Sequence, residues 1–279
     1  MDNLLFRAFP ENSTLRVNTL RAASERAKLY IIFMTPRSGS TWLTELIKNA
    51  EALGIPQEWF NDTWIYSEEE ALGCRPPRLR GTLDINDYVN SIVNECNGIA
   101  GIELSAYQAI MLRDLLDTNF DPQILSTSFY LRRRDIVSQA VSLYRSISSS
   151  RFHSYQNDKH TVDLFNSVEY RYNGILESLN MILDSERIFS ELFAECNIIP
   201  NYIFYEDLVS DPLAELNKIG WTLGTPYQSV LPMTSLSIMR DTRSASWASQ
   251  FTSELPSEIF NIIQEREARA DLRPFSPPA

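Results

Sequence analysis

The segment Thr35–Trp42 combines a glycine, three hydroxyl residues and an arginine at the end of an apolar run. The run, Leu29–Met34, is predicted to be a buried strand. A strand, a turn of small residues and a helix start direct backbone N–H groups and the positive end of a helix dipole to one point. Such a point binds an oxyanion, either a phosphate or a sulfate. The predicted contacts are Arg37, Ser38, Gly39, Ser40, Thr41 and Trp42.

A helix is predicted directly after this turn, because apolar residues recur at helical spacing up to Leu53 and Gly54 is placed to end the helix. The turn differs from the phosphate loop of nucleoside triphosphatases, which needs Gly-Lys-Ser/Thr, since no lysine follows Gly39. The structural alternative is an ordinary strand–helix corner that happens to be rich in small residues.

Composition and charge limit the partners that this chain can have. Of 279 residues, 44% are hydrophobic, and 14 Phe, 12 Tyr and 5 Trp supply a large core, so we predict one folded domain over residues 1–279. The formal net charge of −11 disfavours binding to nucleic acid. Positive charge is clustered locally at Arg132–Arg134, which suits a small anionic ligand.

The three cysteines, Cys74, Cys96 and Cys196, are widely spaced, and no pair has metal-ligand spacing. They are expected to be free thiols in a reducing compartment. The first ten residues do not resemble a secretory signal, and no apolar run reaches the roughly 20 residues of a membrane span. We therefore expect a cytoplasmic protein without a metal.

Alternating strand-like and helix-like segments predict an α/β fold, with a parallel sheet covered by helices on both faces. Ligands of such sheets bind at the carboxyl ends of the strands, where the Thr35 turn lies. Irregular insertions are expected near 61–90 and 146–160, and the second of these could form a substrate mouth or a plain solvated connection. The predicted strands are Leu29–Met34, Ile99–Leu104, Ser128–Leu131 and Tyr202–Tyr205, and the predicted helices are Asp135–Ser146, Asp163–Asn180, Ser185–Cys196 and Asp211–Ile219.

A second basic motif follows the third predicted strand. Arg134 stands at a helix start and Ser142 lies eight residues later, about 12 Å along the helix axis, so a folded-back guanidinium and the hydroxyl could share one phosphate. The structural alternative is a basic helix start with solvent-facing serines. Three arginines at a helix N-terminus are unfavourable without an anion nearby, which weakens this alternative.

Two later segments carry no signal of their own. Tyr205-Glu206-Asp207 is a common strand end, and Arg240–Thr252 indicates a polar loop that enters a helix.

Taken together and in order, these motifs resemble the sulfotransferases that use 3′-phosphoadenosine 5′-phosphosulfate. The turn is similar to their 5′-phosphosulfate loop, with Arg37 where soluble eukaryotic members carry lysine. The resemblance implies that Arg134 and Ser142 hold the 3′-phosphate and that Tyr205 lies near the adenine. It also implies that Arg240 reaches the 3′-phosphate, although the Lys-Gly that follows this arginine in the family is missing here.

Within the superfamily, the segment Pro56-Gln57-Glu58 resembles the bacterial trehalose 2-sulfotransferase-like group. In that group the glutamate is the proposed general base, here Glu58, and Arg37 would act beside it as the second catalytic residue. One departure is Glu103, where relatives tend to carry lysine. The aromatic residues that follow Glu58 are candidates either for stacking on a sugar or for core packing: Trp59, Phe60, Trp64 and Tyr66.

The implied reaction moves a sulfuryl group from 3′-phosphoadenosine 5′-phosphosulfate, without a metal, to a hydroxyl of a small-molecule or glycolipid acceptor. His153 and His160 are alternative bases. The resemblance leaves open a homodimer and transient contact with a membrane. Two other readings remain open at this point: an inactive anion-binding protein on the same fold, and a phosphate-loop kinase, which lacks its lysine here.

Overall fold

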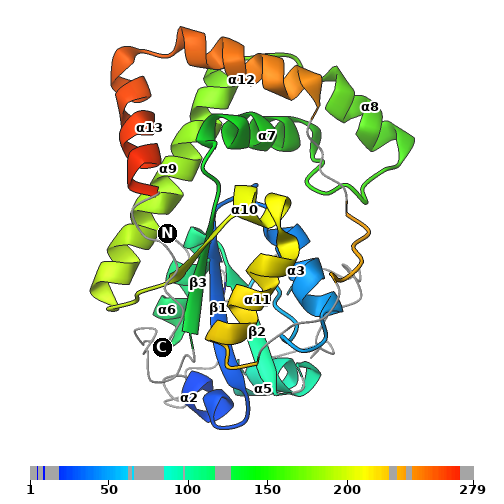
Figure 1. Ribbon diagram of the computed structural model, residues 1–279, viewed down its shortest axis with the longest axis vertical. Helices are drawn as coiled ribbons and strands as arrows, with labels where there is room; N and C mark the ends of the chain where they lie inside the picture. Colours follow the sequence, from blue (N-terminus) through cyan, green and yellow to red (C-terminus); the bar gives the residue numbers. More distant parts are fainter. Residues whose placement is uncertain are drawn as a thin grey trace.

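Four strands form one parallel sheet in the computed structural model (Figure 1). The structure describes residues 5, 9, 19–61, 65, 85–96, 98–116, 127–225, 231–236 and 241–270. The α/β class and the four strands predicted from the sequence are confirmed, with ends that differ by one residue. The strands are β1 (Lys28–Met34), β2 (Ile99–Leu104), β3 (Thr127–Arg132) and β4 (Asn201–Phe204).

The strand order β2-β1-β3-β4 places β1 inside the sheet, with the chain moving to one side for β2 and to the other side for β3 and β4. A doubly wound parallel sheet of this kind opens a crevice at the carboxyl ends of its strands, where the direction of winding changes. The turn after β1 lies at this point.

Helices cover both faces of the sheet, because alternate residues of β1 enter two different cores. One core packs under α2 (Thr19–Ser24), α5 (Ile85–Glu95), α6 (Ala106–Leu116) and the C-terminal half of α9 (Tyr172–Glu195). The other packs under α3 (Ser40–Asn49), α10 (Tyr205–Ser210) and α11 (Pro212–Thr222).

A third core lies beyond the carboxyl ends of the strands (Figure 1). It joins α7, the first half of α9, α12 and α13, while α8 lies at the end of α7. These helices form a layer over the end of the sheet, so that the crevice is closed from above. Their bounds are α7 (Ile136–Ser149), α8 (Lys159–Ser167), α12 (Thr242–Glu254) and α13 (Ser257–Ala270).

Two predicted helices, Asp163–Asn180 and Ser185–Cys196, have the wrong boundaries. The chain breaks instead at the extended residues Val168 and Arg171, which separate α8 from α9. The helix α9 then continues through 180–185, because its buried positions follow one uninterrupted helical stripe through Ile175, Leu179, Ile182, Glu186 and Phe189.

The helix α3, which follows the turn Thr35–Gly39 after β1, is shorter than the sequence suggests. It ends at Asn49, and the chain then turns through Glu51, which has a φ of 57°. Gly54 is needed for a different reason from the one predicted. With a φ of 84°, it passes so close to β2 that a Cβ would lie 2.2 Å from the carbonyl oxygen of Ile99.

The two predicted insertions are partly helical. Residues 85–90 belong to α5, while most of 61–84 lies outside the described residues. In the second region only 150–158 is irregular, because α7 runs to Ser149 and α8 begins at Lys159. Of the helices in the described part of the chain, none is both long enough and apolar enough to cross a lipid bilayer.

Candidate active site

A cavity of about 1300 Å³ lies between the carboxyl ends of the strands and the layer formed by α7, α12 and α13. The residue or turn that follows each strand contributes to its wall: Pro36 after β1, Ser105 after β2, Arg133 after β3 and Tyr205 after β4. The position agrees with the binding site that the parallel sheet predicts.

The turn after β1 has the geometry expected of an anion site. Arg37 and Gly39 both have left-handed backbone angles, with φ of 62° and 94°. The helix α3 then begins at Ser40 without a capping side chain from the described residues. Because Gly39–Trp42 line the cavity, the N-terminus of α3 faces this space with its positive dipole end.

Neighbouring side chains hold this turn in place. Gln139 of α7 donates from Nε2 to the hydroxyl of Thr35 at 2.9 Å and to the carbonyl oxygen of Pro36 at 2.7 Å. Ser38 is fully buried, and its hydroxyl donates to the carbonyl oxygen of Thr35 at 2.7 Å. The side chain of Ser38 therefore supports the turn from within. Its hydroxyl donates inside the turn, whereas the sequence predicts a contact with the ligand.

Gly39 also allows a close contact with Tyr205. A Cβ at this position would lie 2.6 Å from Cδ2 of Tyr205, so any larger residue would displace that ring. The guanidinium of Arg133 also lies over the Tyr205 ring, 4.8 Å from the ring centre. The turn, the third strand and the fourth strand thus meet around one aromatic side chain.

Arg37 and Ser142 are brought together, although the sequence analysis had paired Ser142 with Arg134. Nε of Arg37 donates to the hydroxyl of Ser142 at 3.1 Å, and Nη1 donates to the carbonyl oxygen of Phe152. Burial, and then the charge of Arg133, lower the pKa of Arg37 to about 10. The guanidinium remains positive at neutral pH, in surroundings where an anionic ligand would relieve the repulsion.

Arg134 points to α10 rather than to Ser142. It makes two hydrogen bonds to the carboxylate of Asp207, at 2.7 and 2.9 Å, and its guanidinium lies 4.0 Å from the centre of the Phe204 ring. Arg133 is the arginine of this motif that lines the cavity. Both arginines follow the end of β3, and their partners differ: Arg134 pairs with Asp207, whereas the guanidinium of Arg133 lies over the Tyr205 ring.

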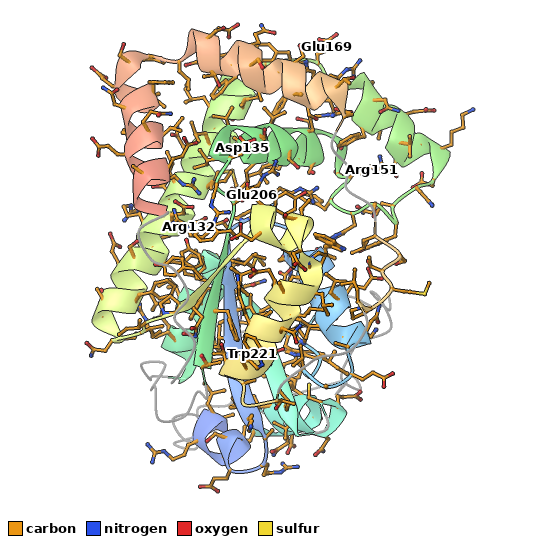
Figure 2. All side chains as sticks on the ribbon, viewed as in Figure 1. Arg132, Asp135, Arg151, Glu169, Glu206 and Trp221 are labelled. Atoms are coloured by element: carbon orange, nitrogen blue, oxygen red, sulfur yellow. The ribbon has the colours of Figure 1, made fainter. Side chains whose placement is uncertain are left out.

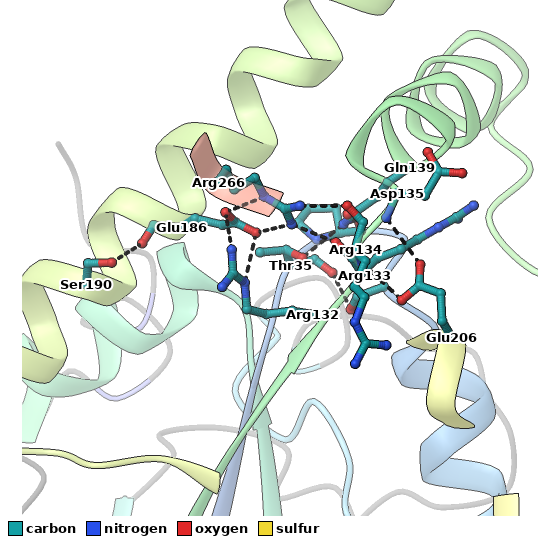
Figure 3. A network of polar contacts seen from close by, with 12 residues as sticks. Thr35, Arg132, Arg133, Arg134, Asp135, Gln139, Glu186, Ser190, Glu206 and Arg266 are labelled. Carbon is teal, nitrogen blue, oxygen red and sulfur yellow. Dashed lines mark hydrogen bonds and ion pairs between the residues drawn. The ribbon is translucent and has the colours of Figure 1, made fainter. Parts of the chain in front are cut away.

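A network of charged groups fixes the backbone at this corner (Figure 3). Glu186 of α9 accepts from Arg132 at 2.8 Å and from Arg266 of α13 at 2.7 Å. Arg266 also donates to the carbonyl oxygens of Arg133 and Arg134, at 2.6 and 2.8 Å. From the opposite side, the carboxylate of Glu206 accepts the backbone N–H groups of Arg134 and Asp135, at 3.0 and 3.2 Å.

Glu58 lines the cavity from the side of β2. Its neighbour Gln57 forms a parallel bridge with β2, in which the N–H of Glu103 donates to the carbonyl oxygen of Gln57 at 2.8 Å. Asn61 and Gln108 then donate to Oε2 of Glu58, at 2.9 and 2.8 Å. Burial raises the pKa of Glu58, while these two hydrogen bonds oppose the rise. A desolvated, oriented carboxylate suits proton abstraction.

Glu103 is a buried carboxyl group beside the partly buried Glu58. Only 3% of its surface is exposed, and its Oε1 atom has no hydrogen-bond partner among the residues that the structure describes. Burial, and then the charge of Glu58, raise the pKa of Glu103 to about 8, against the opposing effect of the Thr44 and Ser40 hydroxyls. Glu103 therefore carries a proton at neutral pH, which explains how a glutamate is tolerated beneath an anion-binding turn.

We expect the stability of the protein to fall as the pH rises from about 4.5 to about 8, through Glu103. The folded chain keeps this proton over a range in which the unfolded chain has released it, so each rise in pH favours unfolding. Glutamine imitates the protonated group, so Glu103→Gln should flatten the dependence of the melting temperature on pH. An unchanged slope in Glu103→Gln, compared with the exposed control Glu95→Gln, would contradict this assignment.

The loop 150–158 contributes a histidine to the cavity. Nδ1 of His153 lies 3.3 Å from the hydroxyl of Thr41, and burial, followed by the charge of Arg37, lowers the pKa of His153 to about 4. The imidazole is therefore neutral at neutral pH. His160 lies on α8 with an exposed side chain.

Two of the aromatic residues after Glu58, Trp59 and Phe60, serve core packing and not a sugar-binding surface. Trp59 and Phe60 are buried in the core under α5, with exposed fractions of 4% and 0%. Nε1 of Trp59 donates to the carbonyl oxygen of Gly101 at 2.9 Å. Trp64 and Tyr66 lie outside the described residues.

The late polar segment forms α12, as predicted. Asp241 caps this helix and pairs with the buried Arg145 at 2.7 Å, while Trp247 and Phe251 pack in the third core. Arg240 lies outside the described residues, so its predicted contact stays a prediction.

A family model for the Stf0 sulphotransferases matches residues 29–254. The chain belongs to this family. The match begins at β1 and ends with α12, so it includes the turn, Glu58 and all four strands.

Named relatives of this Stf0 sulphotransferase include two mycobacterial enzymes. The trehalose 2-sulfotransferase of Mycolicibacterium smegmatis is 23% identical over 267 residues, covering 82% of this chain and 96% of the relative. The trehalose 2-sulfotransferase of Mycobacterium tuberculosis is 23% identical over 265 residues, covering 84% and 97%. A sulfotransferase of Alicyclobacillus acidocaldarius with a crystal structure has a TM-score of 0.43 at 13% identity, covering 84% of this chain and 96% of that chain.

Membership in the Stf0 sulphotransferase family makes sulfuryl transfer the reaction class of this site. Within the described residues, no three histidine, cysteine, aspartate or glutamate side chains gather into a metal-binding group. Arg133 and Ser138 are among the residues of the cavity wall that sequence reasoning missed. Arg133 stands in a run of three arginines whose spacing does not distinguish them, and Ser138 sits on α7 without any distinguishing signal.

Proposed function

We propose that this chain transfers the sulfuryl group of 3′-phosphoadenosine 5′-phosphosulfate to a hydroxyl group of a carbohydrate or glycolipid acceptor. The observation that carries the proposal is the uncapped N-terminus of α3, which shares one cavity with Arg37 and with the partly buried carboxyl group of Glu58. An anion site and a desolvated base are the two groups that transfer of an anionic group to a hydroxyl requires.

The donor would bind along the carboxyl ends of β1, β3 and β4. Arg37 and the N–H groups of Gly39–Trp42 are proposed to hold the 5′-phosphosulfate, with the Thr41 hydroxyl beside them. Ser142 would hold the 3′-phosphate, and the Tyr205 ring would lie near the adenine.

The arginine that reaches the 3′-phosphate is proposed to be Arg134, which would have to leave Asp207, or Arg133, which already lines the cavity. Arg240 is also proposed to contact the 3′-phosphate.

In the reaction, the acceptor oxygen forms a bond to sulfur as the bond from sulfur to the bridging phosphate oxygen breaks. Glu58 takes the proton of the acceptor hydroxyl, and the electron pair of the broken bond goes to the phosphate. Arg37 and the start of α3 stabilise the negative charge that develops there. A sulfuryl group carries less negative charge than a phosphoryl group, so we do not invoke a metal for this step.

The acceptor class rests on the two mycobacterial relatives, whose names specify trehalose. The cavity volume of about 1300 Å³ leaves room for a disaccharide acceptor beside a nucleotide.

We expect Arg37→Ala to weaken binding of adenosine 3′,5′-bisphosphate by about 1.5–3 kcal/mol, roughly 10- to 150-fold in Kd. The variant loses the guanidinium that lies nearest the start of α3. Isothermal titration calorimetry measures the effect, with 5′-AMP and ATP–magnesium as competing ligands. Arg187→Ala serves as the control, because Arg187 is an exposed residue of α9.

Wild-type affinity in Arg37→Ala would remove this residue from the donor site. Binding of ATP–magnesium in place of the bisphosphate would favour the kinase, and binding of neither would contradict the donor. Arg134→Ala in the same titration distinguishes Arg134 from Arg37. Loss of a 3′-phosphate contact should lower the affinity for the bisphosphate and leave the affinity for 5′-AMP unchanged, because 5′-AMP has no 3′-phosphate.

A further inference from the structure

The loop 150–158 is a preformed structure that connects α7 to α8. Oε1 of Gln156 accepts the backbone N–H groups of Phe152 and His153, at 2.7 and 2.9 Å. Nε of Arg151 donates to the carbonyl oxygen of Gln156 at 2.9 Å. The loop therefore satisfies its own polar groups and presents its remaining side chains in defined directions.

The same loop is attached to the phosphate turn. Its carbonyl at Phe152 accepts from Arg37, and its His153 ring lies 3.3 Å from the hydroxyl of Thr41. The side chains that the loop carries are thus held beside the start of α3, where the sulfuryl group is proposed to lie.

Two ring side chains of the loop are stacked on each other. His153 and Tyr155 have ring centres 4.9 Å apart and planes only 8° from parallel. His153 is partly buried and lines the cavity, whereas 42% of Tyr155 is exposed. One face of the tyrosine ring is supported by the imidazole of His153, which lines the cavity, and the residue presents aromatic surface to solvent.

Tyr155 also lies close enough to Glu58 to respond to its charge. Burial, and then the negative charge of Glu58, raise the pKa of the Tyr155 phenol. The imidazole on which Tyr155 stacks lines the same cavity as Glu58, the group that would deprotonate the acceptor. Trp59 and Phe60, which follow Glu58 in the sequence, are closed off in the core and cannot serve there.

We propose that Tyr155, supported by His153, is the stacking platform for a pyranose ring of the acceptor. A pyranose ring presents C–H groups on its faces and hydroxyls at its edge, so stacking on an aromatic ring leaves the hydroxyls free to point sideways. A ring stacked on Tyr155 would direct an edge hydroxyl toward Glu58 and the start of α3. This inference rests on the proposed function, since it assigns the acceptor side of that site.

The test measures sugar binding to the full-length protein saturated with adenosine 3′,5′-bisphosphate. The sugar probes are trehalose and methyl α-glucopyranoside, and the acyclic polyol sorbitol serves as a ligand without a ring. In Tyr155→Ala we expect the Kd of both pyranosides to rise at least about tenfold, whereas Tyr155→Phe keeps the ring and stays within about twofold of the wild type.

A matched control is Trp221→Ala, which removes an exposed aromatic residue far from the cavity. Figure 2 shows Trp221 at the end of α11 opposite the cavity, and Lys28 at the start of β1 donates to the neighbouring carbonyl oxygen of Leu223 at 2.9 Å. This variant should bind both pyranosides like the wild type. Melting temperatures show whether each variant is folded.

The results separate the platform from the donor site. Loss of bisphosphate binding in the wild type would overturn the proposed function itself. Normal bisphosphate binding with wild-type sugar affinity in Tyr155→Ala would overturn the platform alone. The platform is also overturned if the wild type binds the bisphosphate but neither pyranoside, or if it binds sorbitol as tightly as the pyranosides.

Discussion

Replacing Glu58 by glutamine should lower the rate of sulfuryl transfer by about 10²–10⁴ and leave donor affinity unchanged. The amide has nearly the shape of the carboxylate and can keep a contact with Asn61 or Gln108, but it cannot take a proton from the acceptor. Steady-state turnover with saturating donor measures the loss. Calorimetric titration of the bisphosphate shows that the donor site is intact.

Glu95→Gln provides the control, because Glu95 is an exposed glutamate at the end of α5. Unchanged turnover in Glu58→Gln would exclude Glu58 as the base. His153 would then be the next candidate, since the ring is neutral at neutral pH and contacts Thr41. The two bases are distinguishable, because if Glu58 is the base, His153→Gln should raise the acceptor KM through the weakened platform and leave turnover at saturating acceptor unchanged.

Replacing Glu186 by alanine should lower the free energy of unfolding by about 3–5 kcal/mol. The variant leaves Arg132 and Arg266 buried with two positive charges and no carboxylate between them. Burial alone would raise the pKa of Glu186, but Arg266 and Arg132 outweigh it and hold this pKa below its ordinary value. The network is therefore strongly favourable in the folded chain, as Figure 3 indicates by its convergence on one carboxylate.

Urea denaturation measures this loss, with Glu191→Ala as the control on the same helix. Glu191 is exposed and forms an ion pair with the exposed Arg187, so its removal should cost less than about 1 kcal/mol. Equal losses in the two variants would contradict the role given to the buried network.

The sequence predicted the elements whose patterns are local. A mostly apolar run identified each strand, and the small-residue turn between β1 and α3 does line the cavity. Glu58, singled out by its resemblance to a family segment, lines the same cavity, and its role as the base stays a prediction.

The sequence could not predict which side chains of a motif face the cavity. Three consecutive arginines carry the same charge, yet Arg132 enters an ion network, Arg133 lines the cavity and Arg134 pairs with Asp207. Partners from distant parts of the chain decide these outcomes. Ser38 was misjudged for a similar reason, because the hydroxyl finds its acceptor within the turn.

Burial was equally hidden from the sequence. Glutamate usually lies at the protein surface, and only the position of Glu103 on β2, under the start of α3, shows that its side chain is enclosed. The sequence predicts two helices that end and begin at Asn180 and Ser185, whereas the buried positions of α9 continue through this segment.

The self-contained hydrogen bonding of the loop 150–158 has a consequence for how the family diversifies. Gln156 closes this loop internally, whereas the phosphate turn depends on the sheet and on α7. The loop contacts the turn through the carbonyl of Phe152 and the ring of His153, so substitutions at Tyr155 can accumulate without disturbing the turn or the strands. Under the proposed function, such substitutions would alter the acceptor side of the site and leave the donor side unchanged.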